Sequence, residues 1–275
     1  MSKERNRQMI RLLALDMDGT CLNGRSRMTE ETIRTIRKAA DAGIIIVPTS
    51  GRPLTCLPYR MTQEKGLYRY TITSNGAQVV DLEEKKTLFR MLMKRERVVQ
   101  FLRECEGLNV VRMTHIQHRY VMEGPLMEVA GRIVYGRDVD GIRRVNDMEA
   151  FVEKIHYNIE EVQVYFFSGR TRRKVAEILE GYPEFSSAFG SKYVEIFAKN
   201  TSKGTALNAL ASRLGIAKEE IACIGDSAND LPMFEAAGLK IAMGNAVPEL
   251  KKKADIVTYS NHIDGAAKAI EQYIL

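Results

Sequence analysis

The feature that most constrains the fold is an alternation of short apolar runs with helical patterns, at the start of the chain and again near its end. Apolar runs of strand length occupy residues 10–15, 44–47 and 221–224. An amphipathic helix is predicted between the first two runs, because Thr29 is a suitable N-cap and Gly43 follows the helix end. Strands that alternate with helices form the crossover units of a parallel sheet. The alternation therefore predicts an α/β fold.

The middle of the chain has a different pattern. The dipeptide Asn75-Gly76 lies between two β-rich segments and is a strong hairpin signal, which interrupts the parallel order. A basic helix, several short strands and a further helix follow, and this pattern is typical of an α+β unit. The crossover pattern then resumes. We therefore predict one sheet domain, residues 1–83 and 192–275, that is split by an inserted α+β cap of residues 84–191.

Composition, charge and cysteine content limit the class of protein. Of the 275 residues, 45% are hydrophobic and 28% charged, proportions of a globular protein rather than of a disordered or collagenous chain. The net charge of +6 favours anionic partners but does not distinguish phosphates, nucleic acid and lipid headgroups. The four cysteines are scattered without a C-x-x-C pair, which argues against a disulfide framework or a cysteine zinc site. With no long apolar stretch, we expect a cytoplasmic protein without a membrane span.

Acidic residues follow two of the predicted strands. Asp16 and Asp18 end the first strand, and Asp226 and Asp230 follow the strand at 221–224. Ligands bind at the carboxyl edge of open parallel sheets, although a D-x-D-G turn or a complement to a helix dipole would place acids in the same positions. We expect Asp16, Asp18 and Asp226 to crowd together, and a divalent cation would reduce their repulsion. Oxygen ligands favour Mg²⁺.

Two other positions are candidates for binding an anion. The second predicted strand is followed by Ser50, Gly51 and Arg52, where a hydroxyl and a backbone N–H can hold an anion. Lys203 lies near the start of a predicted helix, and its ammonium can meet a phosphate or a carboxylate. Each signal is weak alone, and the glycines that precede the lysine of a P-loop are missing.

Together and in this order, the motifs resemble those of the haloacid dehalogenase-like hydrolases, specifically the Cof-type phosphatases with a large inserted cap. DMDGT at 16–20 looks like motif I, SGR at 50–52 like motif II, Lys203 like motif III and GDSAND at 225–230 like motif IV. The resemblance covers nearly the whole chain. It implies a three-layer Rossmann-like core with a parallel sheet and an inserted α+β cap that governs substrate specificity.

The resemblance also implies roles for individual residues. Asp16 would be the nucleophile that forms an aspartyl-phosphate, and Asp18 the general acid–base. The implied Mg²⁺ ligands are Asp16, Asp18 through its backbone carbonyl, and Asp226, with Asp230 as a support. The implied phosphate-binding residues are Ser50, Gly51, Lys203 and Asn229. Cys21 replaces an apolar residue of the family, and we interpret it as a small core side chain rather than a redox group.

The sequence therefore predicts an Mg²⁺-dependent phosphatase for a small phosphorylated metabolite, either a sugar phosphate or a phosphorylated cofactor. Asp18 favours a phosphatase or a mutase, because the dehalogenase relatives lack this acid. The alternatives are a phosphohexomutase of the same superfamily and a non-catalytic anion- or RNA-binding module. The acidic set argues against the binding module, since nucleic-acid binding has no use for it. We expect neither a nucleic-acid nor a membrane partner, and the oligomeric state is not predicted.

Overall fold

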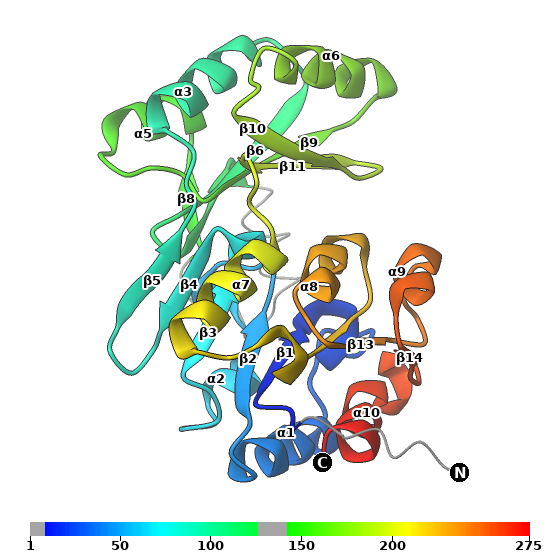
Figure 1. The fold of residues 1–275 in the computed structure, drawn as a ribbon. Helices are drawn as coiled ribbons and strands as arrows, with labels where there is room; N and C mark the ends of the chain where they lie inside the picture. The colour runs from blue at the N-terminus through cyan, green and yellow to red at the C-terminus, as the bar shows by residue number, and fades with distance from the viewer. Residues whose placement is uncertain (1–8, 126–141) are drawn as a thin grey trace. The chain divides into compact units, whose positions relative to one another are not determined.

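The structure is a computed structural model that describes residues 9–125 and 142–275. The chain forms two compact units (Figure 1). The first unit contains Met1–Ser50, Arg60–Phe89 and Ser202–Leu275, and the second contains Gly51–Tyr59 and Arg90–Thr201. Each unit has its own sheet and its own apolar core.

Within the described residues, the first unit is built on an eight-stranded sheet of order β14-β13-β12-β1-β2-β3-β4-β5. Its strands are β1 (Leu12–Asp16), β2 (Ile45–Thr49), β3 (Tyr70–Thr73), β4 (Gln78–Asp81), β5 (Lys86–Arg90), β12 (Ile221–Gly225), β13 (Leu239–Ala242) and β14 (Ile256–Val257). Neighbouring strands from β14 to β3 are all parallel. The predicted hairpin is also present, because β3 and β4 pair antiparallel. The predicted α/β fold with a parallel sheet is confirmed.

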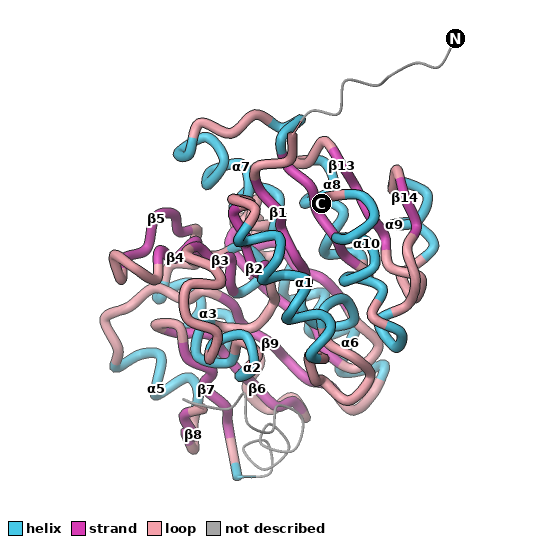
Figure 2. The backbone as a smooth tube through the Cα atoms, turned by 90° about the horizontal axis from the view of Figure 1, so that it is seen from below, coloured by secondary structure: helices cyan, strands magenta, loops and turns pink. Residues whose placement is uncertain are grey.

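Helices cover both faces of this sheet. They are α1 (Glu30–Asp41), α2 (Tyr59–Thr62), α7 (Lys203–Leu214), α8 (Leu231–Glu235), α9 (Pro248–Lys253) and α10 (Gly265–Tyr273). Helix α1 packs against α10 and α7 packs against α8, and in Figure 2 strands β1 and β2 lie between α7 and α1. Thr29 caps α1 as predicted, since its hydroxyl accepts a hydrogen bond from the Thr32 N–H at 3.1 Å. Three layers result, as in a Rossmann-like core.

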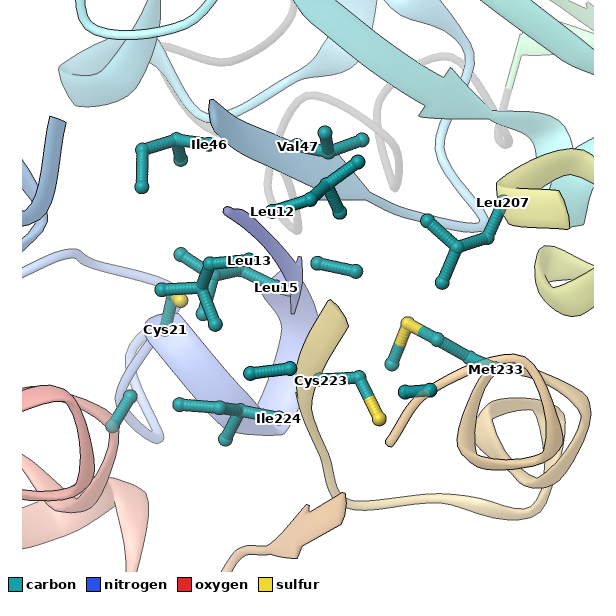
Figure 3. Close-up of a cluster of buried hydrophobic side chains, with 14 of the residues drawn as sticks. Leu12, Leu13, Leu15, Cys21, Ile46, Val47, Leu207, Cys223, Ile224 and Met233 are labelled. Carbon is teal, nitrogen blue, oxygen red and sulfur yellow. The ribbon is translucent and has the colours of Figure 1, made fainter. Parts of the chain in front are cut away.

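Strand β1 lies at the centre of the first core. All five of its residues are buried, because helices cover both faces of the sheet and a two-sided core needs a continuous apolar strand. Figure 3 shows its leucines among side chains of β2, β12, α7 and α8, which include Ile46, Val47, Leu207, Ile224 and Met233. Cys21 is buried in the same cluster, as a small core side chain. Asp16 at the end of β1 is therefore the first charged side chain after the apolar run.

The second unit is an α+β unit with a six-stranded sheet of order β10-β11-β9-β6-β7-β8 in the described residues. Its elements are α3 (Arg95–Glu104), β6 (Val110–Ile116), β7 (Arg119–Glu123), β8 (Arg143–Val145), α5 (Met148–Lys154), β9 (Glu161–Phe166), α6 (Gly169–Leu179), β10 (Phe185–Phe189) and β11 (Tyr193–Ala198). Val162 and Val164 of β9 pack into the core beneath the helices. Gln163 and Tyr165 alternate with them and so lie on the other face of the sheet.

The chain passes between the two units at residues that differ from the predicted limits of 84 and 191. Strand β5 lies beside β4 in the first sheet, whereas β11 pairs with β9 in the second, so the limits move to residues 90 and 201. The segment Gly51–Tyr59 also belongs to the second unit, where the N–H and the hydroxyl of Thr55 both donate to the His118 carbonyl, at 3.1 and 2.9 Å. The role of this unit as a specificity cap stays a prediction.

Two further expectations concern membranes and disulfides. Across the part of the chain that the structure describes, no helix is both long and apolar enough to span a membrane. All four cysteines lie in that part, and each is buried as a free thiol. The cytoplasmic location stays a prediction.

Candidate active site

Three carboxylates meet at the carboxyl edge of the parallel sheet. Asp16 ends β1, Asp226 follows β12, and Asp230 closes the short turn after it; one oxygen of each lies within 4.8 Å of the others. Leu15 and Ile224 pair in register on these neighbouring parallel strands, so the residues that follow them emerge at the same edge. Asp16 and Asp230 are only 4% and 0% exposed. Burial makes their mutual repulsion costly unless positive charge is close.

Lys203 supplies positive charge from inside the cluster. Its Nζ donates to Oδ1 of Asp16 at 2.6 Å and to Oδ1 of Asp230 at 2.7 Å, and the side chain is fully buried. It is the first residue of α7, and Ser202 is the N-cap of that helix. Burial alone would lower the pKa of Lys203, but the two carboxylates outweigh burial and raise this pKa above its ordinary value. The ammonium is therefore charged at neutral pH.

Asp230 organises the loop after β12. Its Oδ2 accepts the backbone N–H groups of Asp226 and Ser227, at 2.9 and 3.0 Å, while its Oδ1 accepts Lys203. Gly225 allows this close approach, since a Cβ there would lie 2.6 Å from Asp230 Oδ2. Both oxygens of Asp230 are thus bound to protein donors. The supporting role of Asp230 stays a prediction.

Asp16 and Asp226 provide the other carboxylate oxygens of the cluster. Asp16 Oδ2 is buried and makes no hydrogen bond within the described residues, and Asp226 Oδ1 accepts the Thr20 hydroxyl at 3.2 Å. Burial and the carboxylate of Asp230 raise the pKa of Asp226 to about 6. Burial and both neighbouring acids also raise the pKa of Asp16, against the opposing effect of Lys203. A buried and a partly buried carboxylate, which offer only oxygen atoms, have the chemistry that could hold a hard divalent cation.

Asp18 does not join the acidic cluster, which corrects the expectation that Asp16, Asp18 and Asp226 crowd together. The chain turns after Asp16, so the Asp18 side chain is exposed and Asp230 is the third carboxylate. Gly19 allows the turn, since it has a φ of +82° and a Cβ there would lie 2.3 Å from Asp226 Oδ2. An exposed carboxylate two residues beyond Asp16 can exchange protons with a substrate or with water.

Ser50 and Asn229 both contact Asn75. Ser50 follows β2; its N–H donates to the Ile72 carbonyl at 2.9 Å, and its carbonyl accepts the Asn75 N–H at 3.1 Å. Asn229 Nδ2 donates to Asn75 Oδ1 at 3.0 Å. Gly51 belongs to the second compact unit. The structure therefore brings Ser50 and Asn229 together through a residue that the sequence identified only as part of a hairpin signal.

Sequence reasoning also missed Thr20 and Asn245. Thr20 holds Asp226, and Asn245 Nδ2 donates to the Gly19 carbonyl at 2.8 Å, which fixes the turn that carries Asp18. Thr20 lies in the DMDGT motif at 16–20, so the sequence could have identified its hydroxyl as a candidate site group. Asn245 is far along the chain, and no pattern in the sequence predicts its contact with Gly19.

A family model for haloacid dehalogenase-like hydrolases matches residues 13–270. The chain belongs to the haloacid dehalogenase-like hydrolases. This hydrolase is 30% identical to a 5-amino-6-(5-phospho-D-ribitylamino)uracil phosphatase of Bacillus subtilis (strain 168), in an alignment that covers 100% of both chains. A second Bacillus subtilis phosphatase for the same compound is 28% identical, over 96% of this chain and 98% of its own.

The solved structures include a haloacid dehalogenase-like hydrolase from Bacteroides thetaiotaomicron. It superposes on this hydrolase with a TM-score of 0.83 at 26% identity, and the match covers 96% of this chain and 99% of the other. The predictions of the family, of its fold and of a hydrolase are confirmed.

Replacing Asp226 by Asn tests the candidate metal site of this hydrolase. If Asp226 is a ligand, we expect Asp226→Asn to raise the Mg²⁺ concentration for half-maximal activity at least about 10-fold, because a negative charge at the site is lost. In the wild type, this concentration should itself rise as the pH falls through about 6, where protons compete for Asp226. Asp41→Asn, an exposed change at the end of α1, is the matched control. An unchanged metal titration would remove Asp226 from the ligand set.

The same variant should increase the free energy of unfolding of the metal-free protein. Above the raised pKa of about 6, the partly buried charge of Asp226 opposes folding, so metal-free Asp226→Asn should be more stable than metal-free wild type. The difference should be on the order of 2 kcal/mol. It should shrink as the pH falls from about 6 toward the ordinary value of 3.8, because the folded wild type then binds the proton. Thermal unfolding in EDTA measures both effects.

Proposed function

We propose that this hydrolase is an Mg²⁺-dependent phosphatase that hydrolyses a small phosphorylated metabolite through an aspartyl-phosphate on Asp16. The observation that carries the proposal is the buried Asp16 carboxylate, bound to Lys203 and adjacent to Asp226 at the sheet edge. A carboxylate so placed is a nucleophile whose position is fixed before the substrate arrives. The phosphatase names of the relatives that match over their full length support the same activity.

The residues support a two-step reaction. An oxygen of Asp16 attacks phosphorus while the bond from phosphorus to the leaving oxygen breaks, and Asp18 donates its proton to that oxygen. A water molecule then attacks the phosphorus of the aspartyl-phosphate, Asp18 takes the proton from this water, and phosphate leaves with Asp16 restored. When bound by Asp16, the Asp18 backbone carbonyl and Asp226, Mg²⁺ would neutralise the repulsion between a carboxylate and an anionic phosphate.

Four donors are proposed to contact the transferring phosphoryl group. Its equatorial oxygens carry most of the negative charge, so fixed N–H and O–H groups lower the barrier without reorganising. Lys203 and Ser50 are both buried in the first unit. The full proposed set is the Ser50 hydroxyl, the Gly51 N–H, the Lys203 ammonium and the Asn229 amide.

The second unit is proposed to select the leaving group. On its sheet, Tyr165 of β9 and Tyr193 of β11 stack with ring centroids 5.1 Å apart, on the face opposite the helices, and both are partly exposed. Burial raises the pKa of both phenols, with Glu195 contributing, so they remain neutral hydrogen-bond donors at neutral pH. An aromatic pair with two hydroxyl groups suits a leaving group that has a flat heterocycle and hydroxyls. A phosphorylated ribitylaminouracil and a phosphorylated cofactor both have these features.

Replacing Tyr193 by Ala tests this selection. We expect kcat/KM for a heterocyclic phosphate such as FMN to fall about 10-fold, the size of one lost aromatic stacking contact. Hydrolysis of glycerol phosphate, which has no ring, should change little. Tyr193→Phe is the matched control, because it keeps the stacking and removes only the hydroxyl. An equal change for both substrates would show that the second unit does not select for a ring.

EDTA-sensitive turnover of p-nitrophenyl phosphate by the purified protein tests the activity itself. We expect EDTA to abolish turnover and added Mg²⁺ to restore it. Measuring kcat/KM for a set of phosphorylated metabolites would then rank the substrates. Interconversion of hexose phosphates with a bisphosphate activator, at a rate above hydrolysis, would favour the phosphohexomutase. Binding of anions without any turnover would favour the non-catalytic module and overturn the proposal.

A further inference from the structure

The turn Ser74–Gly76 contacts more of the candidate site than a hairpin requires. Asn75 is only 5% exposed and has a φ of +54°, a left-handed conformation that asparagine adopts at low cost. A Cβ at Gly76 would lie 2.1 Å from the Ser202 carbonyl, so glycine is required where the turn meets the start of α7. The turn therefore packs against the helix end that carries Lys203.

The backbone of Asn75 fixes the direction of the Gly51 N–H. The Asn75 N–H donates to the Ser50 carbonyl at 3.1 Å, and the Ser50 N–H donates to the Ile72 carbonyl at 2.9 Å. In a planar trans peptide, the carbonyl of one residue and the N–H of the next point in opposite directions. Because Asn75 holds the Ser50 carbonyl, the Gly51 N–H is directed away from the turn.

The side chain of Asn75 fixes the orientation of the Asn229 amide. Its Oδ1 accepts Asn229 Nδ2 at 3.0 Å, and Asn229 Oδ1 accepts the Ser227 hydroxyl at 2.6 Å. These two bonds determine which end of the Asn229 amide carries the nitrogen. An amide nitrogen has two hydrogens, so the second N–H of Asn229 remains a donor for an anion.

We infer that Asn75 is a positioning residue for phosphoryl transfer: it orients the Gly51 N–H and the second N–H of Asn229, two donors from segments far apart in sequence. The inference rests on the proposed phosphatase function. It deepens that function because one residue, through its backbone and its side chain, sets two of the four proposed contacts. Asparagine meets both demands, since it accepts a left-handed backbone and supplies a side-chain acceptor.

Three variants separate the side chain from the backbone. Asn75→Gly keeps the N–H and the left-handed backbone but removes the acceptor, and we expect kcat for p-nitrophenyl phosphate to fall about 10- to 100-fold, a range set by the loss of one oriented donor. Asn75→Asp keeps an acceptor; kcat should stay within a few-fold of wild type, while the added charge raises KM for the anionic substrate. Lys85→Gly, an exposed left-handed position in the next turn, controls for the glycine itself and should match wild type.

A double-variant cycle tests whether Asn75 acts through Asn229. Asn229→Ala removes the donor that Asn75 orients, so adding Asn75→Gly to it should cost almost nothing more in kcat. A further loss equal to that in the Asn75→Gly single variant would overturn the route through Asn229. The Mg²⁺ concentration for half-maximal activity should be the same in all these proteins, whereas a general disturbance of the loop after β12 would change it.

The possible outcomes distinguish a failure of the positioning role of Asn75 from a failure of the proposed phosphatase function. Absence of turnover in the wild type would overturn the proposed function. Turnover in the wild type with an unchanged kcat in folded Asn75→Gly would overturn only the positioning role. If Asn75→Gly unfolds, the Asn75→Asp variant provides the test. The positioning role is contradicted if Asn75→Asp is folded by circular dichroism and its kcat is as low as that of Asn229→Ala.

Discussion

Asp16→Asn is expected to abolish turnover of phosphate monoesters while the protein keeps its fold. The amide is not a nucleophile toward phosphorus, so the proposed aspartyl-phosphate cannot form, and the loss in kcat should be at least about 10⁴-fold, the size expected when a nucleophile is removed. The fold should survive because the Asn oxygen can still accept the Lys203 ammonium that now binds Asp16 Oδ1 at 2.6 Å. Removing one charge from a crowded acidic cluster also reduces repulsion.

Steady-state kinetics with p-nitrophenyl phosphate and circular dichroism on the same samples measure this result. The variant should also fail to trap a metal-fluoride mimic of the phosphoryl group. Asp18→Asn is the matched control, because it keeps Asp16. A reactive ester should still phosphorylate Asp16 in this variant. Turnover should be slow because Asp18 no longer transfers protons to the leaving oxygen and from water. Turnover at the wild-type rate in Asp16→Asn would exclude Asp16 as the nucleophile.

The parallel sheet could be predicted because its determinants are local. Strand β1 is apolar from Leu12 to Leu15, as a strand covered on both faces must be, and it ends at the charged residue Asp16. Thr29 caps α1, and Gly215 ends α7 with a φ of +63°. Residues that follow parallel neighbouring strands meet at one edge by geometry alone, so the meeting of Asp16 and Asp226 also followed from the pattern.

The rest depends on contacts between residues far apart in sequence. A strand pattern does not show which sheet the strand joins, so the placement of β5 and β11 was not predictable. The exchange of Asp18 for Asp230 in the acidic cluster depends on the turn at Gly19, which directs one carboxylate to solvent. Asn75 showed only its turn preference, because its partners lie at Ser50 and Asn229.

Lys203→Met is expected to destabilise the metal-free protein by about 3–5 kcal/mol at neutral pH, the cost of leaving buried charges without a counterion. Methionine nearly matches the length of lysine, so the loss reflects charge more than volume. Asp16 and Asp230 would remain buried without the ammonium that both now bind. The control is Lys240→Met, which breaks the more exposed pair with Asp255 and should cost at most about 1 kcal/mol.

The pH dependence of Lys203→Met identifies the cause of its instability. Without Lys203, burial leaves the pKa of Asp16 raised above its ordinary value of 3.8 with no opposing cation, so the folded variant binds protons that the unfolded chain does not. The variant should therefore gain stability relative to wild type as the pH falls through the raised pKa and toward the ordinary one. Adding Asp16→Asn to the variant should restore part of the lost stability at neutral pH, because it removes one of the two uncompensated charges. Thermal unfolding in EDTA across this range measures both effects, and a pH-independent deficit would assign the loss to packing instead of to the buried acids.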